Sequence, residues 1–346
     1  MFQTMLENVV ERQNLTTVEA NEAMEAIMNG AIPESVTASF LTALRMKDIS
    51  SDELTGFLNV MREKVIPIHY NRSEAILDVC GTGGAKFKTF NVSTGISFVL
   101  AAGGVSVAKH GNRSYSSKSG SAEILEALGF NIQMTPEKAE HLLNKHQMTF
   151  LFAPLYHPAM KNVVPIRKAL GIRTVFNILG PLTNPANVNR QLIGVYDKTL
   201  ISKFTDVFEN YNYECAMVVH GSLGADEILT CADTHVGFLN GTKRFYDISP
   251  KDFGLKKSKP EEIANMEPEK SAETLVKAFN GQKGPITDFI LANAAAGFLV
   301  TEIVKDLKEG VQYANELLDN GKAYQKLRDT VLESGGNIEQ CDSFIE

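Results

Sequence analysis

The sequence predicts an α/β protein with a small N-terminal helical domain and a larger domain built on a mostly parallel central sheet. Up to residue 66 the patterns are helical only, whereas short apolar runs alternate with helical segments further along. The length of 346 residues also exceeds what one typical core accommodates. We therefore expect a helical domain over residues 1–66, joined by helices from about 160–182, and an α/β domain over 67–346.

Two capping boxes mark helix starts in the N-terminal domain. Thr16 precedes Glu19 by three residues, and Ser50 precedes Glu53 in the same way. A helix between them is predicted from apolar residues at helical spacing, namely Val36, Phe40, Leu41 and Leu44. Pro67 should end the last of these helices, so the domain boundary is expected near this residue.

The second domain is predicted from alternating strands and helices. Strands are expected at 75–80, 105–109, 149–153, 192–195 and 216–220. Helices are expected at 92–102, 121–128 and 199–208, and from residue 285 onward. Of the remaining stretches, 154–190 holds five prolines and is expected to return to the helical domain, and 249–271 is polar enough for a surface connection.

The composition argues against several classes of protein. A formal charge of −7 disfavours non-specific nucleic-acid binding, which depends on neutralising phosphates. There is no apolar run long enough to span a membrane and no signal-peptide pattern, so a cytoplasmic protein is expected. The four cysteines lie far apart, without the spacing of a metal site, which favours a reducing compartment.

A glycine-rich turn follows the first predicted strand. The turn Gly81-Thr82-Gly83-Gly84 would let the backbone approach a ligand, and the helix after it would present N–H groups and partial positive charge to an anion. The alternative is an ordinary turn between a strand and a helix. The spacing fits neither a P-loop nor the dinucleotide fingerprint, because Lys86 stands where that fingerprint has its last glycine.

A dense polar run follows the second predicted strand. From Lys109 to Ser114 it reads Lys-His-Gly-Asn-Arg-Ser, and combines a mobile point charge with the rigid donor fork of arginine. Ordering such a run is costly unless a ligand compensates, and charge-assisted hydrogen bonds contribute roughly 1.5–3 kcal/mol each. We interpret the run as a phosphate-binding segment. The alternative is a solvated loop rich in serine.

Further along the chain, an acid pair and an arginine are also candidates. Asp226 and Glu227 are adjacent, and beside a polyphosphate such carboxylates could hold Mg²⁺. An acidic surface turn is the commoner fate of such a pair. Arg167 could pair with a substrate carboxylate or remain a surface arginine, and the Gly- and Pro-rich segment 176–185 could form a pocket wall.

The order of these motifs resembles the anthranilate phosphoribosyltransferase family over essentially the whole chain. The resemblance rests on Gly81–Gly84, Thr89–Thr94, Lys109–Ser121, Arg167, Phe176–Ala186 and Asp226-Glu227. It implies a nucleoside phosphorylase-like, class III phosphoribosyltransferase fold. It also implies transfer of the phosphoribosyl group of phosphoribosyl pyrophosphate (PRPP) to anthranilate, the second step of tryptophan biosynthesis from chorismate. The family uses Mg²⁺, here expected as two ions, and forms a homodimer through its helical domain.

The resemblance also implies roles for individual residues. PRPP would be bound by Gly81, Gly84, Ala85, Thr89, Asn91, Val92, Ser93, Thr94, Lys109, His110, Gly111, Asn112, Arg113, Ser114, Tyr115, Ser116, Ser117 and Ser121. Anthranilate would be bound by Gly81, His110, Asn112 and Arg167. The metal would be held by Ser93, Asp226 and Glu227. The residues expected to matter most for catalysis are Lys109, Asn112 and Arg167.

The chain departs from the family pattern directly after the glycine-rich turn. The family continues with Asp-Gly, whereas Ala85-Lys86-Phe87-Lys88 follows here. Because a carboxylate that could trap the ion is missing, we predict weaker inhibition by high Mg²⁺. Two alternative functions are a pyrimidine nucleoside phosphorylase of the same fold and a non-enzymatic relative that binds nucleic acid. The acidic composition and the retained acid pair argue against the second.

Overall fold

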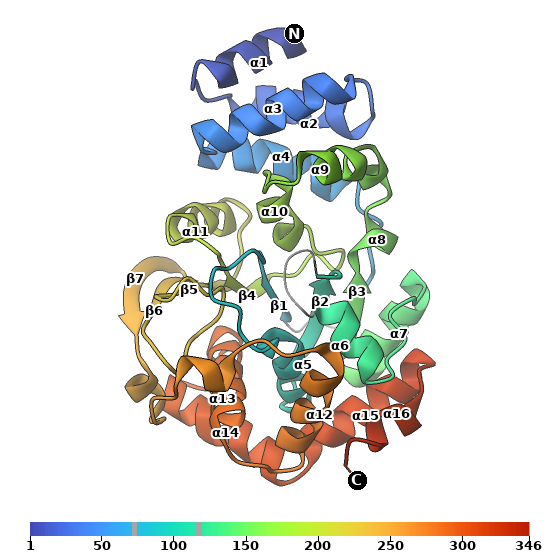
Figure 1. The fold of residues 1–346 in the computed structure, drawn as a ribbon, viewed down its shortest axis with the longest axis vertical. Coiled ribbons are helices and arrows are strands. Elements are labelled where there is room, and N and C mark those ends of the chain that lie inside the picture. Colours follow the sequence, from blue (N-terminus) through green and yellow to red (C-terminus); the bar gives the residue numbers. More distant parts are fainter. Residues whose placement is uncertain (71–74, 115–119, 346) are drawn as a thin grey trace. The chain divides into compact units, whose positions relative to one another are not determined.

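The computed structural model describes residues 1–70, 75–114 and 120–345 (Figure 1). The chain forms two compact units, one made of Met1–Pro67 with Pro154–Pro185, and the other of Ile68–Ala153 with Ala186–Glu346. The chain therefore leaves the helical unit, builds part of the α/β unit, returns, and leaves again. Among the helices described, none has the length and apolar character needed to cross a membrane.

The helical unit has the two capping boxes that the sequence predicts. Thr16 Oγ1 accepts the N–H of Glu19 at 3.2 Å, and Ser50 Oγ accepts that of Glu53 at 3.2 Å. Such caps stabilise a helix by about 1 kcal/mol. The elements of this unit are α1 (Phe2–Val10), α2 (Thr17–Met28), α3 (Glu34–Lys47), α4 (Ser51–Glu63), α8 (Ala153–Tyr156), η1 (Pro158–Asn162), α9 (Val164–Leu170), α10 (Phe176–Leu179) and η2 (Gly180–Leu182).

A buried ion pair joins two helices of the helical unit. Lys47 Nζ lies 2.8 Å from Glu53 Oε2, and the two side chains are 2% and 0% exposed. The ammonium also donates to Asn14 Oδ1 at 2.7 Å, and Glu53 Oε1 accepts the N–H of Leu15 at 2.9 Å. Both charges are therefore compensated by contacts inside the unit, as buried charges require.

The α/β unit is built on a seven-stranded sheet with the order β3-β2-β1-β4-β5-β6-β7 (Figure 1). Neighbours from β3 to β5 are parallel, and β6 and β7 are antiparallel additions at one edge. The strands are β1 (Ile76–Gly81), β2 (Ser106–Gly111), β3 (Met148–Phe152), β4 (Arg190–Gly194), β5 (Cys215–Gly221), β6 (Thr234–Asn240) and β7 (Thr242–Ile248). The predicted fold class is thus confirmed.

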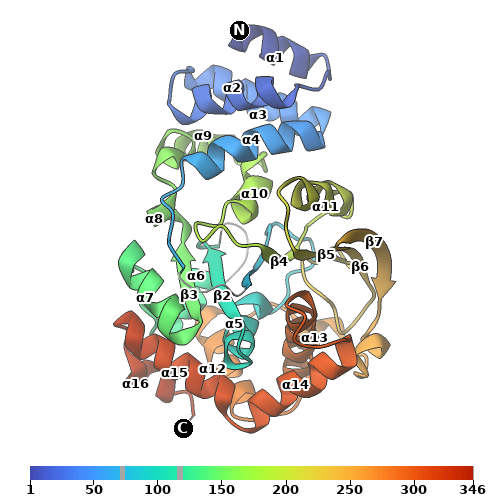
Figure 2. The same ribbon diagram turned by 180° about the vertical axis from the view of Figure 1, so that it is seen from behind.

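Helices cover the sheet of the α/β unit. Helix α5 packs against β1 and β2, α13 against β4 and β5, and α11 against β5 and β6. Behind α5 and α13 lie α14 and α15 (Figure 2). These elements are α5 (Val92–Ala102), α6 (Ser121–Ala127), α7 (Pro136–His146), α11 (Leu200–Asn210), η3 (Pro250–Phe253), η4 (Pro260–Ile263), α12 (Pro268–Phe279), α13 (Pro285–Val300), α14 (Leu307–Asp319), α15 (Lys322–Ser334) and α16 (Ile338–Asp342).

The structure differs from the sequence-based expectation in several places, among them helix α12, which begins inside the stretch expected to be a surface connection. Strand β2 continues to Gly111, so the strand does not end at Lys109 and the first residues of the polar run are extended backbone. The hairpin β6–β7 and helix α7 were not expected. Both carry local signals: an Asn240-Gly241 turn in which Gly241 has φ +65°, and a Thr135 cap followed by proline.

Candidate active site

The strand order of the sheet changes direction between the neighbouring strands β1 and β4. The chain moves outward from β1 to β3 and then returns to place β4 on the other side of β1. Gly81 ends β1, Gly194 ends β4, and the two residues are paired. Open α/β sheets bind ligands outside the carboxyl ends of their strands at such a point. The glycine-rich turn therefore starts where this fold binds ligands.

The glycine-rich turn is held at both of its ends. Thr82 donates its N–H to Gly194 O at 2.9 Å, and its hydroxyl accepts the N–H of Tyr196 at 3.0 Å. Gly83 and Gly84 have φ of +66° and +76°, which L side chains rarely adopt. After the turn, Lys86 donates its N–H to Gly224 O at 2.9 Å. The backbone of the turn is thus fixed by contacts on either side.

Asp226 contacts the glycine-rich turn directly. Its Oδ2 accepts the N–H of Gly83 at 2.9 Å. A Cβ on Gly194 would lie 1.6 Å from Asp226 O, so no larger residue fits at the end of β4. On the other side of the acid pair, buried Asn293 of α13 exchanges two hydrogen bonds with the backbone of Ile228. The acid pair and the turn, which are remote in the sequence, are therefore neighbours.

The carboxyl groups of the acid pair are destabilised as anions. Desolvation raises the pKa of Asp226, although the hydrogen bond from Gly83 acts in the opposite direction. Desolvation also raises the pKa of Glu227 well above its usual value, and the adjacent charge of Asp226 raises it further. A cation bound here would relieve both effects.

The chemistry of the donors fits Mg²⁺. Two carboxylates and the hydroxyl of Ser93 are hard oxygen ligands of the kind that Mg²⁺ takes. Within the described ranges, no group of three His, Cys, Asp or Glu side chains is placed to hold a metal ion. Two carboxylates and one hydroxyl would supply only part of a coordination shell. Mg²⁺ commonly completes its shell with water and substrate phosphate, so this arrangement suits a substrate-bound ion.

Lys109 is a buried strand residue, which corrects the expectation of a mobile charge. Its side chain is 1% exposed, because it lies under the start of α5. The ammonium donates to Val79 O at 2.7 Å and to Ser93 Oγ at 3.3 Å. Burial lowers the pKa of Lys109, and the nearby charge of Asp78 opposes that shift. Lys109 is thus a fixed positive charge that lies next to Ser93 at the start of α5.

Helix α5 begins at Val92, as the sequence predicts, with a side-chain cap at its first turn. Asn91 Oδ1 accepts the N–H of Thr94 at 3.3 Å and its hydroxyl at 2.7 Å. The side chain of Val92 is fully buried, so it could meet a ligand only through its backbone. Ahead of the helix, Ala85 is buried and Thr89 forms a β-bridge with Ala264.

The polar run after β2 is tied to α6. Arg113 forms two hydrogen bonds with Glu126, at 2.7 and 2.6 Å, so its donor fork is engaged. Glu123 accepts the N–H groups of Ser114 and Gly120, at 3.2 and 3.0 Å. Asn112 is exposed, and its Oδ1 accepts the N–H of Arg113. The remaining predicted residues are Ser121, which begins α6, and Tyr115, Ser116 and Ser117, which lie outside the described residues.

Arg167 lies in α9 of the helical unit, whereas the other predicted site residues belong to the α/β unit. Its guanidinium lies 5.8 Å from the centre of the Phe176 ring, in the segment predicted to form a pocket wall. His157 belongs to the same unit, and burial lowers its pKa to about 4. This histidine is therefore neutral at pH 7.

Comparison with known proteins identifies the family. The model of the glycosyl transferase family a/b domain matches residues 73–324, and that of the family's helical bundle domain matches residues 3–65. Anthranilate phosphoribosyltransferase from Petrotoga mobilis is 46% identical over 332 residues, which cover 96% of this chain and 96% of that protein. The chain belongs to the anthranilate phosphoribosyltransferase family.

Solved structures of anthranilate phosphoribosyltransferases share the fold. The enzyme from Thermus thermophilus matches with a TM-score of 0.90 at 37% identity, over 95% of this chain and 99% of that chain. The enzyme from Saccharomyces cerevisiae, in complex with PRPP and Mg, matches with a TM-score of 0.89 at 26% identity, over 96% and 98%. Another structure of the yeast enzyme contains 4-fluoroanthranilate and has a TM-score of 0.86 at 26% identity, over 97% and 99%. The family predicted from the sequence is therefore confirmed.

Sequence reasoning missed one polar residue at the candidate site. Asp78 lies in the middle of β1, is fully buried, and accepts the N–H of His110 on its Oδ1 at 3.1 Å. An acidic residue inside a short apolar run is itself a signal, because an unpartnered carboxylate there would be costly.

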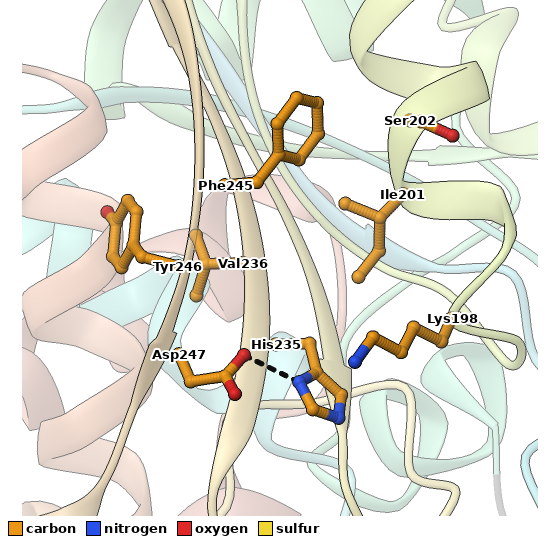
Figure 3. A pocket seen from close by; sticks show the side chains of 8 residues that line it. All are labelled: Lys198, Ile201, Ser202, His235, Val236, Phe245, Tyr246 and Asp247. Carbon is orange, nitrogen blue, oxygen red and sulfur yellow. Dashed lines mark hydrogen bonds and ion pairs between the residues drawn. The ribbon is translucent and has the colours of Figure 1, made fainter.

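A hollow of about 460 Å³ lies away from these residues, between α11 and the hairpin β6–β7 (Figure 3). His235 Nδ1 lies 2.6 Å from Asp247 Oδ1 on its wall, and the ammonium of Lys198 points toward the same imidazole. The hollow is lined by Lys198, Ile201, Ser202, His235, Val236, Phe245, Tyr246 and Asp247. None of these belongs to the motifs of the phosphoribosyltransferase family described above, so we do not place the reaction here.

Proposed function

We propose that this protein transfers the phosphoribosyl group of PRPP to the amine of anthranilate, giving N-(5-phosphoribosyl)anthranilate and pyrophosphate. One observation carries this proposal. The glycine-rich turn after β1 donates a backbone hydrogen bond to Asp226 at the carboxyl edge of the sheet. This contact joins an anion-binding turn to a carboxylate pair that needs a cation, which is the combination that a pyrophosphate–Mg²⁺ substrate requires.

The reaction is a displacement at the anomeric carbon of ribose. The bond from carbon to the pyrophosphate oxygen breaks, the bond from carbon to the anthranilate nitrogen forms, and the amine loses a proton. Catalysis of such a step depends on positioning and on stabilising the charge that develops on the leaving group. The fixed ammonium of Lys109 would favour that charge.

Ser93, Asp226 and Glu227 would hold Mg²⁺. When bound, Mg²⁺ supplies positive charge to the departing pyrophosphate. We propose two ions per site, as the resemblance to the family implies.

Asn112 and Arg167 would orient anthranilate. The guanidinium of Arg167 suits a planar carboxylate, and Asn112 is exposed just after β2. An aromatic amine is neutral at pH 7, so the reaction needs no strong general base.

We also propose that the helical unit forms a homodimer, and sedimentation of the purified protein at twice the mass of the 37.9 kDa chain would support it.

The test is the loss of anthranilate fluorescence on mixing the protein with PRPP, Mg²⁺ and anthranilate. Turnover that requires all three components supports the proposal, and Arg167→Ala should raise the KM for anthranilate much more than that for PRPP. No turnover, combined with phosphorolysis of thymidine or uridine, would instead identify a pyrimidine nucleoside phosphorylase. Retention on DNA at low salt without any turnover would favour the non-enzymatic alternative.

A further inference from the structure

The strands β1 and β2 stop pairing before their carboxyl ends. The paired residues are Ile76 with Ser106 and Leu77 with Val107. On the other sides of the same strands, the ladder of β1 with β4 runs on to Gly81, and that of β2 with β3 runs on to Gly111. The β1–β2 ladder therefore has an opening, a stretch without paired residues, at the edge where the candidate site lies, although the two strands remain neighbours.

Two side chains bridge this opening in opposite directions. Asp78 of β1 accepts the N–H of His110 of β2 at 3.1 Å. Lys109 of β2 donates to the carbonyl of Val79 of β1 at 2.7 Å. Buried backbone groups need partners, and here a carboxylate and an ammonium serve in place of a continued strand ladder.

The bridge is buried and carries two opposite charges. The side chains of Asp78 and Lys109 are 0% and 1% exposed, and the charge of Asp78 opposes the effect of desolvation on the pKa of Lys109. Lys109 also donates to Ser93 at the start of α5, and its charge acts on Glu227. The bridge is thus connected to the residues expected to hold the metal.

The two segments that we expect to bind PRPP leave the sheet on either side of this opening. The glycine-rich turn follows β1, and the polar run continues from β2. We propose that Asp78 is a positioning residue for PRPP: with Lys109, it links β1 to β2 beyond the end of their ladder and so sets the spacing between these two segments. The inference rests on the proposed function, and it concerns a residue for which no role in the reaction has been assigned above.

Two substitutions separate the hydrogen bond from the charge. Asp78→Asn keeps an acceptor for the N–H of His110 but removes the negative charge of Asp78 that acts on Lys109, whereas Asp78→Ala removes both. Because a misplacement of about 1 Å can cost up to about a hundredfold in rate, we expect Asp78→Ala to raise the KM for PRPP at least about tenfold. Asp78→Asn should raise it less, and the KM for anthranilate should stay within about twofold of wild type in both variants.

Glu53→Gln is the matched control. Glu53 is also a fully buried carboxylate that accepts backbone N–H groups and faces a buried lysine, but it belongs to the helical unit. This substitution should lower the thermal unfolding temperature while leaving the KM for PRPP unchanged. Thermal unfolding and steady-state kinetics are measured on all four proteins, using Asp78→Asn for the conclusion if Asp78→Ala fails to fold.

The outcomes are distinct. A selective rise in the KM for PRPP, partly restored in Asp78→Asn and not seen in Glu53→Gln, supports the positioning role. An unchanged KM for PRPP in Asp78→Asn, or an equal rise in Glu53→Gln, overturns the inference while turnover by the wild type leaves the proposed function standing. No turnover by the wild type would overturn the proposed function and, with it, this inference.

Discussion

Lys47 in the helical unit and Lys109 in the α/β unit are both buried, but the surrounding contacts differ. The ammonium of Lys47 lies 2.8 Å from Glu53, and the two charges face one another directly. The ammonium of Lys109 donates to a strand carbonyl and to the hydroxyl of Ser93, in the first turn of α5. The first lysine links helices of one bundle, and the second places a positive charge next to Ser93 at the candidate site.

This comparison shows how similar chemistry can serve stability or function. A buried ion pair is weak evidence for net stabilisation, because desolvation offsets much of the attraction. What distinguishes Lys109 is that its charge acts on Glu227, one of the expected metal ligands. The contacts of the ammonium, rather than the burial of the lysine, therefore indicate a functional role.

The largest expected effect comes from replacing each lysine by methionine. Lys47→Met leaves the buried carboxylate of Glu53 without its partner, which should lower the free energy of unfolding by about 3–5 kcal/mol. Lys109→Met should also lower it, because the buried carbonyl of Val79 loses a donor. Only Lys109→Met should also lose kcat/KM per folded molecule, by about a hundredfold or more, as when an electrostatic donor is removed from an active site. Chemical denaturation and anthranilate fluorescence measure the two effects. An equal loss of activity in Lys47→Met would break the comparison.

The next effect concerns the acid pair and pH. The pKa of Glu227 in the folded protein lies above the unfolded value of 4.5, so the metal-free fold loses stability as pH rises from 4.5 through the raised pKa. Glu227→Gln removes this pH-dependent loss and should lower Mg²⁺ affinity by at least about tenfold.

Thermal unfolding from pH 5 to 8, with EDTA and with Mg²⁺, measures both properties of Glu227. In the wild type, Mg²⁺ should stabilise the fold more as the pH rises, because it binds the ionised carboxylate. Parallel pH profiles for the wild type and Glu227→Gln would contradict the assignment.

A smaller effect is expected at the position where the chain departs from its family. Ala85→Asp restores a carboxylate after the glycine-rich turn, and one added charge contributes about 1 kcal/mol, so inhibition by Mg²⁺ should begin at a roughly fivefold lower concentration. Ala85→Asn is the neutral control of similar size. Superimposable curves of rate against Mg²⁺ for the wild type and Ala85→Asp would refute the idea.

The smallest effect is expected at Arg113. Its guanidinium is engaged by Glu126 in an exposed pair, which contributes roughly 0.2–1 kcal/mol to stability. Glu126→Gln should free the arginine for a substrate phosphate and lower the KM for PRPP by up to about fivefold at low salt. An unchanged KM for PRPP would mean that Arg113 has a structural role only.

Local patterns predicted much of the fold and the main motifs. Helix α5 has the bounds that its apolar spacing predicts, and both capping boxes form because they depend on residues three apart. The hairpin β6–β7 could have been predicted from Asn240-Gly241. By contrast, the burial of Lys109 could not be read from the polar run, because Val79 and Ser93, which hold its ammonium, come from other elements. The bridge from Asp78 to His110 depends in the same way on the pairing of β1 with β2.

The central claim is that the glycine-rich turn, the polar run after β2 and the acid pair bind one PRPP molecule. A crystal structure of the protein with PRPP and Mg²⁺ tests it most directly. The account predicts density for the pyrophosphate against residues 81–84, with the ion beside Asp226 and Glu227. Density for PRPP at another place, such as the hollow beside His235, with these three segments empty, would contradict it.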